Sequence, residues 1–568
     1  MLPFVFAVGI MCGDQHVSLA PSDQFKSILS ELKSQAADLH SSNRQFFAND
    51  RAQLVLHTSL RNVADREAAS IATELGFVLH VMSADQLDTA DSFRDVLNKS
   101  DRLHLPEADD ALGQTASSGL AILSHSDLLI AVGDVDESIL KFASDMARPV
   151  IHLPSDGASA ATIHWGAFEP AFVTARDDPA ALKPYSAEQI ETVLGLLLAP
   201  PEDPRERQFV SQFQNERRRL WHLRIEYPLL LAVAGISGFK RRHFHTDRAI
   251  ADTDEEWARY RQACFRAEAV SVETDLLRSW YEWTDSLAGH FAQSYRSGHV
   301  FNFVLGAVAV LLGVSNLVLP QWSIFLETTL FFVVLAILMN TVAGNRQQWH
   351  RRWLDYRQLA ERLRPMRTLK LLGLAAPDPP GTAADPVARR WVEWYAARAW
   401  RAIGAPTGRI DAARLEALTE TIVDNEIDPQ VAYHYSAARQ VLRLDCRLGI
   451  VSFAAFVLAL CSSIILLTGF AIAPVWVAKN YDWFTVLAAG LPAIGTAAVG
   501  IRVQGDHSGS AARSQRSAAV LAQIGQRLRA ERTSLKRAAD LTEQAARAML
   551  GDLDEWQLLN QQHDLSVG

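Results

Sequence analysis

The chain has 568 residues, of which 49% are hydrophobic and 21% charged, and its formal net charge is −9. This length exceeds one compact domain and predicts three or four structural units. The acidic balance gives no reason to expect a nucleic-acid partner. The four cysteines lie far apart and form no metal-spaced pair, so neither a disulfide framework nor a zinc site is predicted.

The first 150 residues alternate short apolar runs with helical patterns. Because the apolar start at 1–10 lacks basic residues and soon meets Asp14, we interpret it as a buried strand and not as a signal peptide. Strands are expected at 4–10, 53–57, 77–82, 103–105, 128–132 and 150–153. Helices are expected at 25–39, 64–75, 115–125 and 137–147. This alternation predicts an α/β unit within residues 1–200, with a parallel sheet covered on both faces.

Ligands of such sheets bind beyond the carboxyl ends of the strands. The loops at these ends supply the candidate ligand-binding residues Gly9, Gly13, Asp14, Ser59, Asp65, Gly133 and Asp134. A phosphate cradle needs glycines that let backbone N–H groups approach the anion, but residues 61–63 and 135–138 contain none. We therefore expect a degenerate, non-catalytic unit that binds an unusual ligand or contacts another protein.

Residues 201–300 are expected to form a helical linker beside the membrane. The apolar run at 227–239 has only 13 residues between two basic clusters, which is short for a span and favours an interfacial or docking helix. A helix around 254–297 then leads into the membrane part.

Four segments are long and apolar enough to cross a bilayer, which needs about 20 helical residues. They cover 301–320, 324–343, 448–477 and 483–501. Short turns at 321–323 and 478–482 join them into two antiparallel hairpins, and amphipathic helices at 347–372 and 511–550 follow. The second half is therefore expected to be all-α: hairpins at 301–343 and 448–501, a helical segment at 344–447 and a C-terminal helix at 502–568.

The basic residues predict the orientation of these spans. Residues 344–447 contain 17 Lys and Arg, whereas the two short turns together contain one, Lys479. The positive-inside rule then places the middle segment and both termini in the cytoplasm. Small residues at Ala489, Ala493 and Ala497 suit close helix packing, either inside one subunit or in a homo-oligomer.

Aromatic and basic side chains mark the helix that leaves the second span. Trp349, Trp353, Tyr356 and Arg357 are expected either to anchor it at the inner leaflet or to make it a rigid lever that couples domain motion to the hairpin. A second aromatic group is expected to pack against this helix: Trp391, Trp394, Tyr395 and Trp400. Glu327 is ionisable within an apolar run, which marks either a pore-lining residue or a carboxylate that reaches the interface.

Two stretches of the chain resemble known families. The segments 57–60, 64–66 and 124–134 resemble the SLOG family of Rossmann-like ligand-sensing domains, although the glycine-rich loops of that family are missing. The segments 285–297, 353–364, 500–506 and 549–556 are similar to the SLATT-type membrane proteins. This resemblance implies a bacterial inner-membrane effector that perturbs the membrane in conflict or antiviral systems when a sensor detects a nucleotide-derived signal.

The sequence contains no nucleophile elbow, P-loop, metal pair or Ser/His/Asp arrangement, so we expect neither an enzyme nor a cofactor. The first functional hypothesis is a sensor–effector in which the front unit gates the spans. The alternative is a non-conducting scaffold that lies in the lipid bilayer and recruits a partner protein. A small-solute transporter is disfavoured by the lack of polar residues at mid-membrane, although Pro492 interrupts the fourth span.

Overall fold

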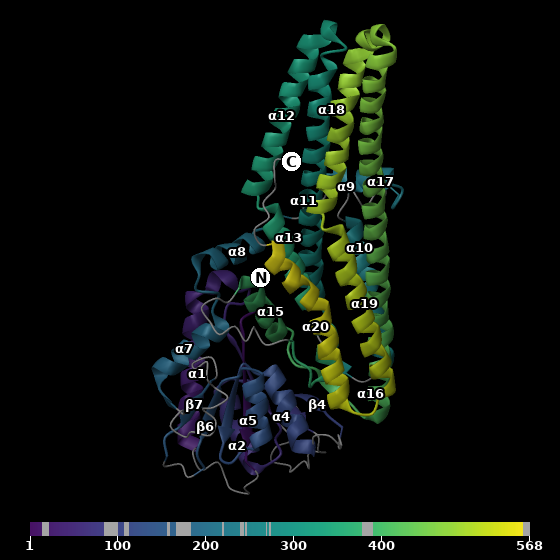
Figure 1. Cartoon of the computed structure of the whole chain (residues 1–568). Helices are drawn as coiled ribbons and strands as arrows, with labels where there is room; N and C mark the ends of the chain where they lie inside the picture. Colours follow the sequence, from purple (N-terminus) through teal and green to yellow (C-terminus); the bar gives the residue numbers. More distant parts are fainter. Residues whose placement is uncertain are drawn as a thin grey trace.

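The structure is a computed structural model. It describes residues 1–13, 22–83, 100–106, 113–155, 159–165, 183–217, 221–238, 244, 247–267, 270–271, 274–377 and 390–560. An α/β domain forms one end of the molecule, and four long apolar helices form the other (Figure 1). The predicted fold class is thus confirmed at this level.

The centre of the sheet is parallel and lies where the sequence predicts it. Its strands are β1 (Val5–Cys12), β2 (Gln53–Thr58), β3 (Val78–Ser83), β4 (Asp101–His104), β5 (Leu128–Val132) and β6 (Val150–Leu153). In space they run β6-β5-β1-β2-β3-β4, so the order reverses beside β1 as in a doubly wound fold. The strands are buried along most of their length, because helices cover both faces.

Helices alternate with these strands. They are α1 (Ser22–Ser42), α2 (Val63–Glu74), α4 (Gly113–His125) and α5 (Glu137–Asp145), followed by α7 (Ala187–Leu198) and α8 (Pro204–Gln214). The four helices predicted in this region are therefore confirmed.

Both edges of the sheet are extended by short strands. At one edge, β7 (Thr162–His164) pairs antiparallel with β6, and β8 (Lys183–Pro184) pairs antiparallel with β7. At the other, β10 (Thr407–Arg409) pairs parallel with β4, and β9 (Val270–Ser271) pairs with β10. The sheet thus draws strands from the expected linker and the expected middle segment, well outside residues 1–200.

Four helices are long and apolar enough to cross a membrane within the described part of the chain. They are α11 (Asp275–Ser315), α12 (Ser323–Arg346), α17 (Asp428–Ile472) and α18 (Pro474–Gln504). With 41 and 45 residues, α11 and α17 are about 60–70 Å long, roughly twice the hydrocarbon thickness of a bilayer. Their first halves therefore continue outside the apolar zone and run down toward the α/β domain (Figure 1).

The two hairpins turn at different kinds of break. The first turn contains the 3₁₀ helix η6 (Pro320–Trp322), as expected. The second turn was predicted at 478–482, which is wrong, because α17 ends at Ile472 and α18 begins at Pro474. Proline has no N–H to donate and favours the first turn of a helix, so Pro474 begins α18. Hydropathy stays high on both sides of this residue, so hydropathy does not mark the turn.

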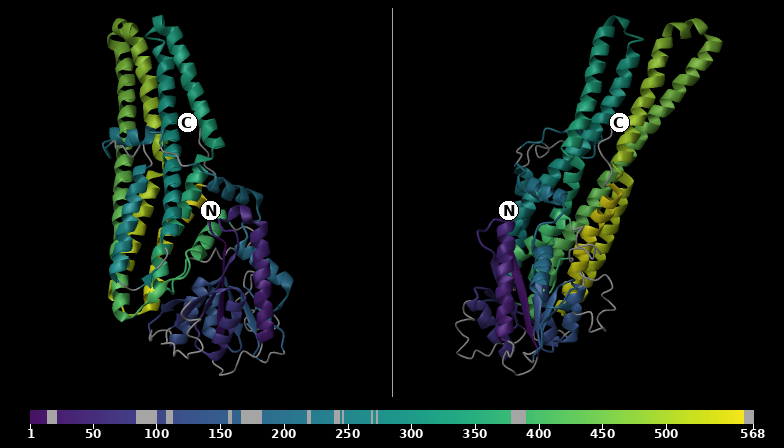
Figure 2. Two further views of the ribbon diagram at one scale, coloured as in Figure 1. Left: turned by 180° about the vertical axis from the view of Figure 1, so that it is seen from behind. Right: turned by 90° about the vertical axis from the view of Figure 1, so that its left-hand side faces the viewer.

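The three helices that the sequence predicted at 254–297, 347–372 and 511–550 are each divided into two. After the first hairpin, Pro365 separates α13 (Trp349–Leu363) from α14 (Met366–Leu372). After the second, α19 (His507–Ala530) ends before α20 (Leu535–Asn560), which folds back along it (Figure 2). Before the first, the pattern at 254–297 is split between α10 (Asp247–Ala267) and α11.

The two hairpins nevertheless share one backbone feature. Gln348, directly before α13, has φ +51°, and Asp506, directly before α19, has φ +40°. Both are left-handed and neither is glycine. In both units, the helix that follows the second span therefore begins directly after a left-handed residue.

The short helix α9 (Glu226–Val233) lies across α11 and not along it (Figure 2). Apolar side chains beside and within it are exposed, with Leu223 at 89% and Val233 at 80%. This position and exposure fit the interfacial helix expected at 227–239.

Candidate functional site

The carboxyl edge of the sheet, where ligands were expected, is closed by its own side chains. Asp65 is 1% exposed. One carboxylate oxygen accepts from the Cys12 N–H at 3.1 Å, and the other accepts from the Ser59 hydroxyl at 2.6 Å and the Arg61 N–H at 3.2 Å. Burial raises the pKa of Asp65. The Asp65 carboxylate thus accepts from the Cys12 and Arg61 N–H groups, which an anionic ligand would need as donors.

Two helix N-termini at this edge are also capped. Asn62 accepts from the Asp65 N–H at 2.7 Å, at the start of α2, and Asp136 accepts from the Ser138 N–H at 2.8 Å, at the start of α5. Helix N-termini are the usual phosphate sites of doubly wound folds. Here side chains of the protein occupy them.

The candidate glycines have structural roles. Gly9 packs against α4, where an added Cβ would lie 2.7 Å from Ile122. An added Cβ at Gly13 would overlap the Asp134 carbonyl, and Gly133 has φ +69°. The structure therefore brings Gly13, Gly133 and Asp134 together through packing and a turn, whereas Asp14 lies outside the described residues.

The orientation of the sheet separates this edge from the spans. In Figures 1 and 2 the strands run away from the N-terminus, so their carboxyl ends point away from the apolar helices and their amino ends face the helical part. The carboxyl edge therefore lies at the end of the sheet that is farther from the apolar helices.

Helix α15 (Trp391–Ala402) docks on the amino edge of the sheet. The fully buried Asp127, just before β5, accepts from Arg398 at 2.7 Å and Arg401 at 3.0 Å, and its other oxygen accepts from the Ala7 N–H at 3.1 Å. Burial alone would raise the pKa of Asp127, but the two guanidinium groups outweigh burial and hold it well below its usual range.

The tryptophans of α15 complete this junction. Trp394 and Trp400 donate to sheet-domain carbonyls, those of Leu198 at 3.1 Å and Ser124 at 3.0 Å. Trp391 donates in the opposite direction, to Asp355 of α13 at 3.1 Å. The expected packing of this aromatic group on the helix after the second span is thus confirmed for Trp391, while the other two tryptophans hold the sheet.

The predicted coupling residues at the start of α13 pack against neighbouring helices. Trp349 is buried, with the Arg224 guanidinium 5.3 Å from its ring. Trp353 lies 5.6 Å from the ring of Tyr295 and 4.9 Å from the guanidinium of Arg296.

Further along α13, Tyr356 lies inside the protein and Arg357 is partly buried. The Tyr356 side chain is 2% exposed and donates to Glu216 at 2.9 Å, and Arg357 pairs with Asp285 of α11 at 3.1 Å. A buried ring offers no surface to lipid, so the expectation that Tyr356 anchors the helix in the membrane is wrong. Its contacts fit the other expectation, in which α13 couples domains.

Glu327 lies in the second turn of α12 on the outer surface of the chain. It is exposed and accepts from Asn316 at 3.3 Å. Within one chain it therefore lies at the surface beside the end of α11, and its role in a pore stays a prediction.

Polar side chains instead join α11 and α12 near the opposite ends of these spans. Asn302 donates to Thr341 at 2.9 Å, and Asn340 donates to Asn302 at 2.7 Å and to the Gly298 carbonyl at 3.1 Å. Arg224, which precedes α9, donates to Asn340 at 2.5 Å. These contacts connect α12 to α11 and to the segment before α9.

Over the described ranges, no group of three or more His, Cys, Asp or Glu side chains could hold a metal ion. The site therefore has three parts. Asp65 and the helix caps fill the carboxyl edge of the sheet, α15 packs on its amino edge, and α13 connects α15 to the spans. Together these define a membrane protein with an α/β domain fastened to a double helical hairpin. Comparison with known proteins finds no matching family, no similar curated protein and no similar solved structure.

Proposed function

We propose that this chain is a sensor–effector of the bacterial inner membrane, with both termini in the cytoplasm. The α/β domain controls a four-span module that forms a pore or perturbs the lipid bilayer. The resemblance to SLOG and SLATT-type proteins supports a role in bacterial conflict or antiviral defence. The signal is a nucleotide-derived compound or a partner protein.

One observation carries this proposal: the contact between Asp355 of α13 and α15. Asp355 accepts from Trp391 at 3.1 Å and from Arg390 at 2.5 Å. Because α15 is also bound to the sheet through Asp127, a displacement of the sheet displaces α13. Only Gln347 and Gln348 separate α13 from the end of α12.

The outward position of Glu327 supports an assembly of several copies. A polar passage that includes this carboxylate needs a second chain on the exposed face of α12. We therefore propose that the active form is a homo-oligomer.

A non-conducting scaffold is the second candidate. The capped helix N-termini at the carboxyl edge favour it, because they leave few backbone donors for a small anion. In this case the degenerate domain recruits a partner protein and the spans only hold it at the membrane.

The test is ion flux through liposomes that contain the full chain. Asp355→Asn keeps the shape of the side chain but weakens the charged link to α15, an effect on the order of 1.5–3 kcal/mol. For a gated effector we expect a change in flux of about tenfold or more, as a constitutive leak or a lost response. Glu416→Gln, at a side chain that is 60% exposed, is the matched control and should leave flux unchanged. If neither wild type nor variant conducts in any oligomeric state tested, the scaffold replaces the effector.

A further inference from the structure

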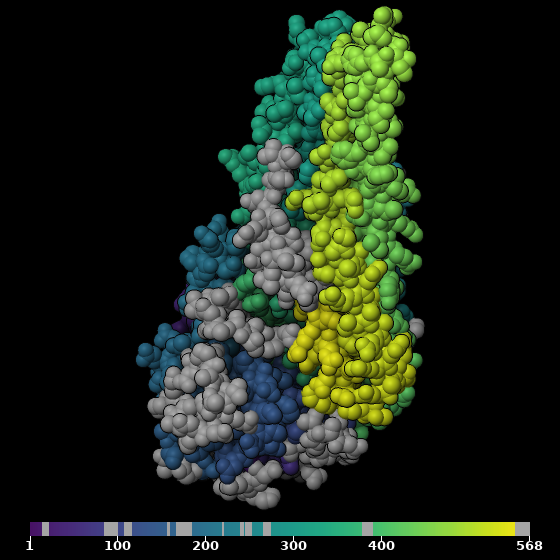
Figure 3. All heavy atoms as spheres, viewed as in Figure 1, coloured from purple at the N-terminus to yellow at the C-terminus, as the bar shows by residue number. Residues whose placement is uncertain are grey.

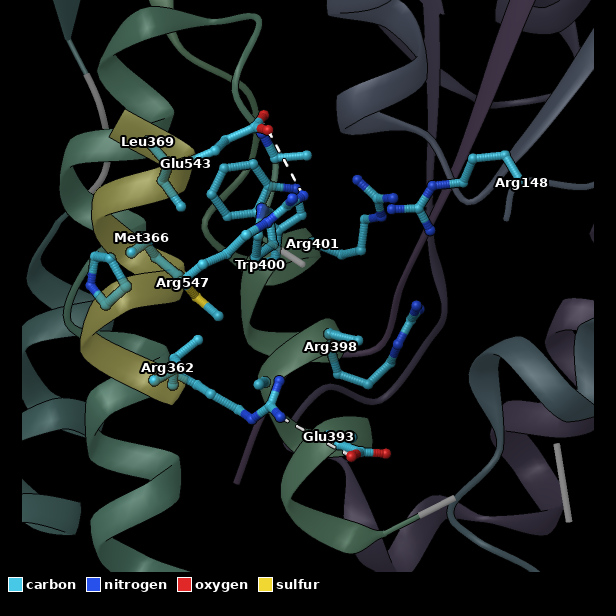
Figure 4. A pocket seen from close by; sticks show the side chains of 17 residues that line it. Arg148, Arg362, Met366, Leu369, Glu393, Arg398, Trp400, Arg401, Glu543 and Arg547 are labelled. Carbon is cyan, nitrogen blue, oxygen red and sulfur yellow. Dashed lines mark hydrogen bonds and ion pairs between the residues drawn. The ribbon is translucent and has the colours of Figure 1, made fainter. Parts of the chain in front are cut away.

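An arginine-rich cleft separates α20 from the α/β domain (Figure 4). Its walls come from α13 and α14, from α15, from α20, and from the segment before β6 that carries Arg148. In the space-filling view, α20 reaches down beside the domain (Figure 3). The cleft contains about 680 Å³ of space without protein atoms, part of it open to solvent.

Five arginines line this cleft: Arg148, Arg362, Arg398, Arg401 and Arg547. Figure 4 shows Arg547 on α20 at one side of the cleft and Arg148 on the opposite wall, with Arg362 directed toward Glu393. Two glutamates, Glu393 and Glu543, also line it. Positive charge therefore exceeds negative charge even when the buried Asp127 behind α15 is included.

Arg398 and Arg401 donate to Asp127, and the two glutamates lie beside Arg362 and Arg547. Glu393 lies 3.9 Å from Arg362, and Glu543 lies 4.0 Å from Arg547 while it accepts from the Ala376 N–H at 2.9 Å. Burial raises the pKa of Glu543.

Two buried guanidinium N–H groups in the cleft wall are unsatisfied. The Nε atoms of Arg362 and Arg398 are shielded from solvent and have no hydrogen-bond partner among the described residues. A buried charged donor without an acceptor is costly, and such groups in native proteins commonly await a ligand or an ordered solvent molecule.

We propose that this cleft binds a small, soluble, phosphate-bearing anion that clamps α20 to the α/β domain. Guanidinium groups pair with phosphate oxygens in a bidentate manner, and Arg362 and Arg547 line the cleft from two of its walls. Met366, Leu369 and Trp400 supply an apolar wall for the rest of the ligand. The site lies at the amino edge of the sheet, opposite the closed carboxyl edge.

A lipid headgroup is the other source of phosphate, but the geometry disfavours it. Arg362 lies 14 positions beyond Gln348, the kink at which α13 leaves the second span, which corresponds to about 21 Å of helix. That distance carries the cleft away from the headgroup layer. The inference does not require the spans to conduct, so its failure would leave the proposed function standing.

The test is calorimetric titration of the full chain, in nanodiscs of zwitterionic lipid, with pyrophosphate as the probe. We expect saturable binding that weakens by about tenfold or more in Arg362→Gln and in Arg547→Gln, because each loses a charge-assisted hydrogen bond. Glu543→Gln should bind more tightly, since it removes a negative charge and keeps an acceptor for the Ala376 N–H. A misfolded variant would not gain affinity.

Arg537→Gln is the matched control, because Arg537 lies on the same helix but is 62% exposed and pairs with Glu531. Its affinity for pyrophosphate should equal that of the wild type. The proposal is overturned if pyrophosphate does not bind, or if Arg362→Gln, Arg547→Gln and Glu543→Gln all bind as the wild type does. It is also overturned if nanodiscs of anionic lipid abolish pyrophosphate binding by direct competition, because the ligand would then be a headgroup.

Discussion

The carboxylate of Asp127 lies 2.7 Å from the guanidinium of Arg398, although 271 residues separate them in the chain. Both side chains are withdrawn from solvent, and Arg401 joins the pair at 3.0 Å. Removal of the carboxylate leaves two buried positive charges, so Asp127→Asn is expected to destabilise the protein by about 3–5 kcal/mol.

Denaturant unfolding of the full chain in detergent, followed by tryptophan fluorescence, measures this loss. Asp424→Asn is the comparison, because its pair with Arg529 is solvent-exposed and contributes about 0–1 kcal/mol. Equal unfolding midpoints for the two variants would show that Asp127 does not hold α15 to the sheet.

Acidification should weaken the α/β domain through three buried histidines. Burial lowers the pKa of His80 to about 4, and it lowers the pKa values of His57 and His125 well below the usual range. The unfolded chain binds these protons near pH 6.5 while the folded chain does not, so stability falls as the pH drops from about 7 to about 4. Each histidine contributes at most about 1.4 kcal/mol per pH unit.

The variant His80→Gln tests this pH dependence, since glutamine can still donate to the Pro406 carbonyl that His80 contacts at 3.1 Å. Its free energy of unfolding should fall less steeply between pH 6.5 and 4.5 than that of the wild type. Parallel curves would contradict the idea that His80 is buried in its neutral form.

The two hairpins should separate if a side chain is added at Gly500 of α18. A Cβ there would overlap the ring of Phe303 on α11, so Gly500→Ala is expected to cost about 1–3 kcal/mol. Gly306→Ala is the control on α11, because a Cβ at that position meets nothing within 4 Å. The thermal midpoint in detergent measures both changes.

Phe303→Ala provides the second arm of this test. In the double variant the overlap disappears, so the two costs should not add. Additive costs would mean that Gly500 and Phe303 do not touch in the membrane.

Labelling of single cysteines checks the orientation. The exposed positions Gln321 and Val475 lie at the two hairpin turns, whereas Asp23 and Glu416 lie at the other end of the molecule. In a chain without its native cysteines, an impermeant maleimide added outside spheroplasts should react only at 321 and 475. Reaction at 416 instead would reverse the topology and exclude a cytoplasmic α/β domain.

The sequence by itself determined the elements whose signals are local. The six parallel strands and the four long apolar helices lie where hydropathy and periodicity place them, because burial on two faces and contact with lipid both require continuous apolar residues. The shortage of glycines at 61–63 and 135–138 also indicated a poor phosphate cradle before the caps at Asn62 and Asp136 were visible.

The breaks between elements were predicted less well. Hydropathy stays high through Ala473, so the turn was placed too late, and only the start of α18 at Pro474 locates it. The division between α19 and α20 was missed for a similar reason, since the amphipathic pattern continues on both sides of 531–534.

Only the tertiary structure decided what the two halves do to each other. Strand β10 joins the sheet, α15 docks through Asp127, and Arg148 faces Arg547 across one cleft. Such contacts join residues hundreds of positions apart. Their free energy comes from pairing charges and burying aromatic rings between elements, and the sequence of one element does not indicate which other element it contacts. An arginine on an amphipathic helix has the same local pattern whether it meets water, a carboxylate or a ligand, so the fold alone selects among them.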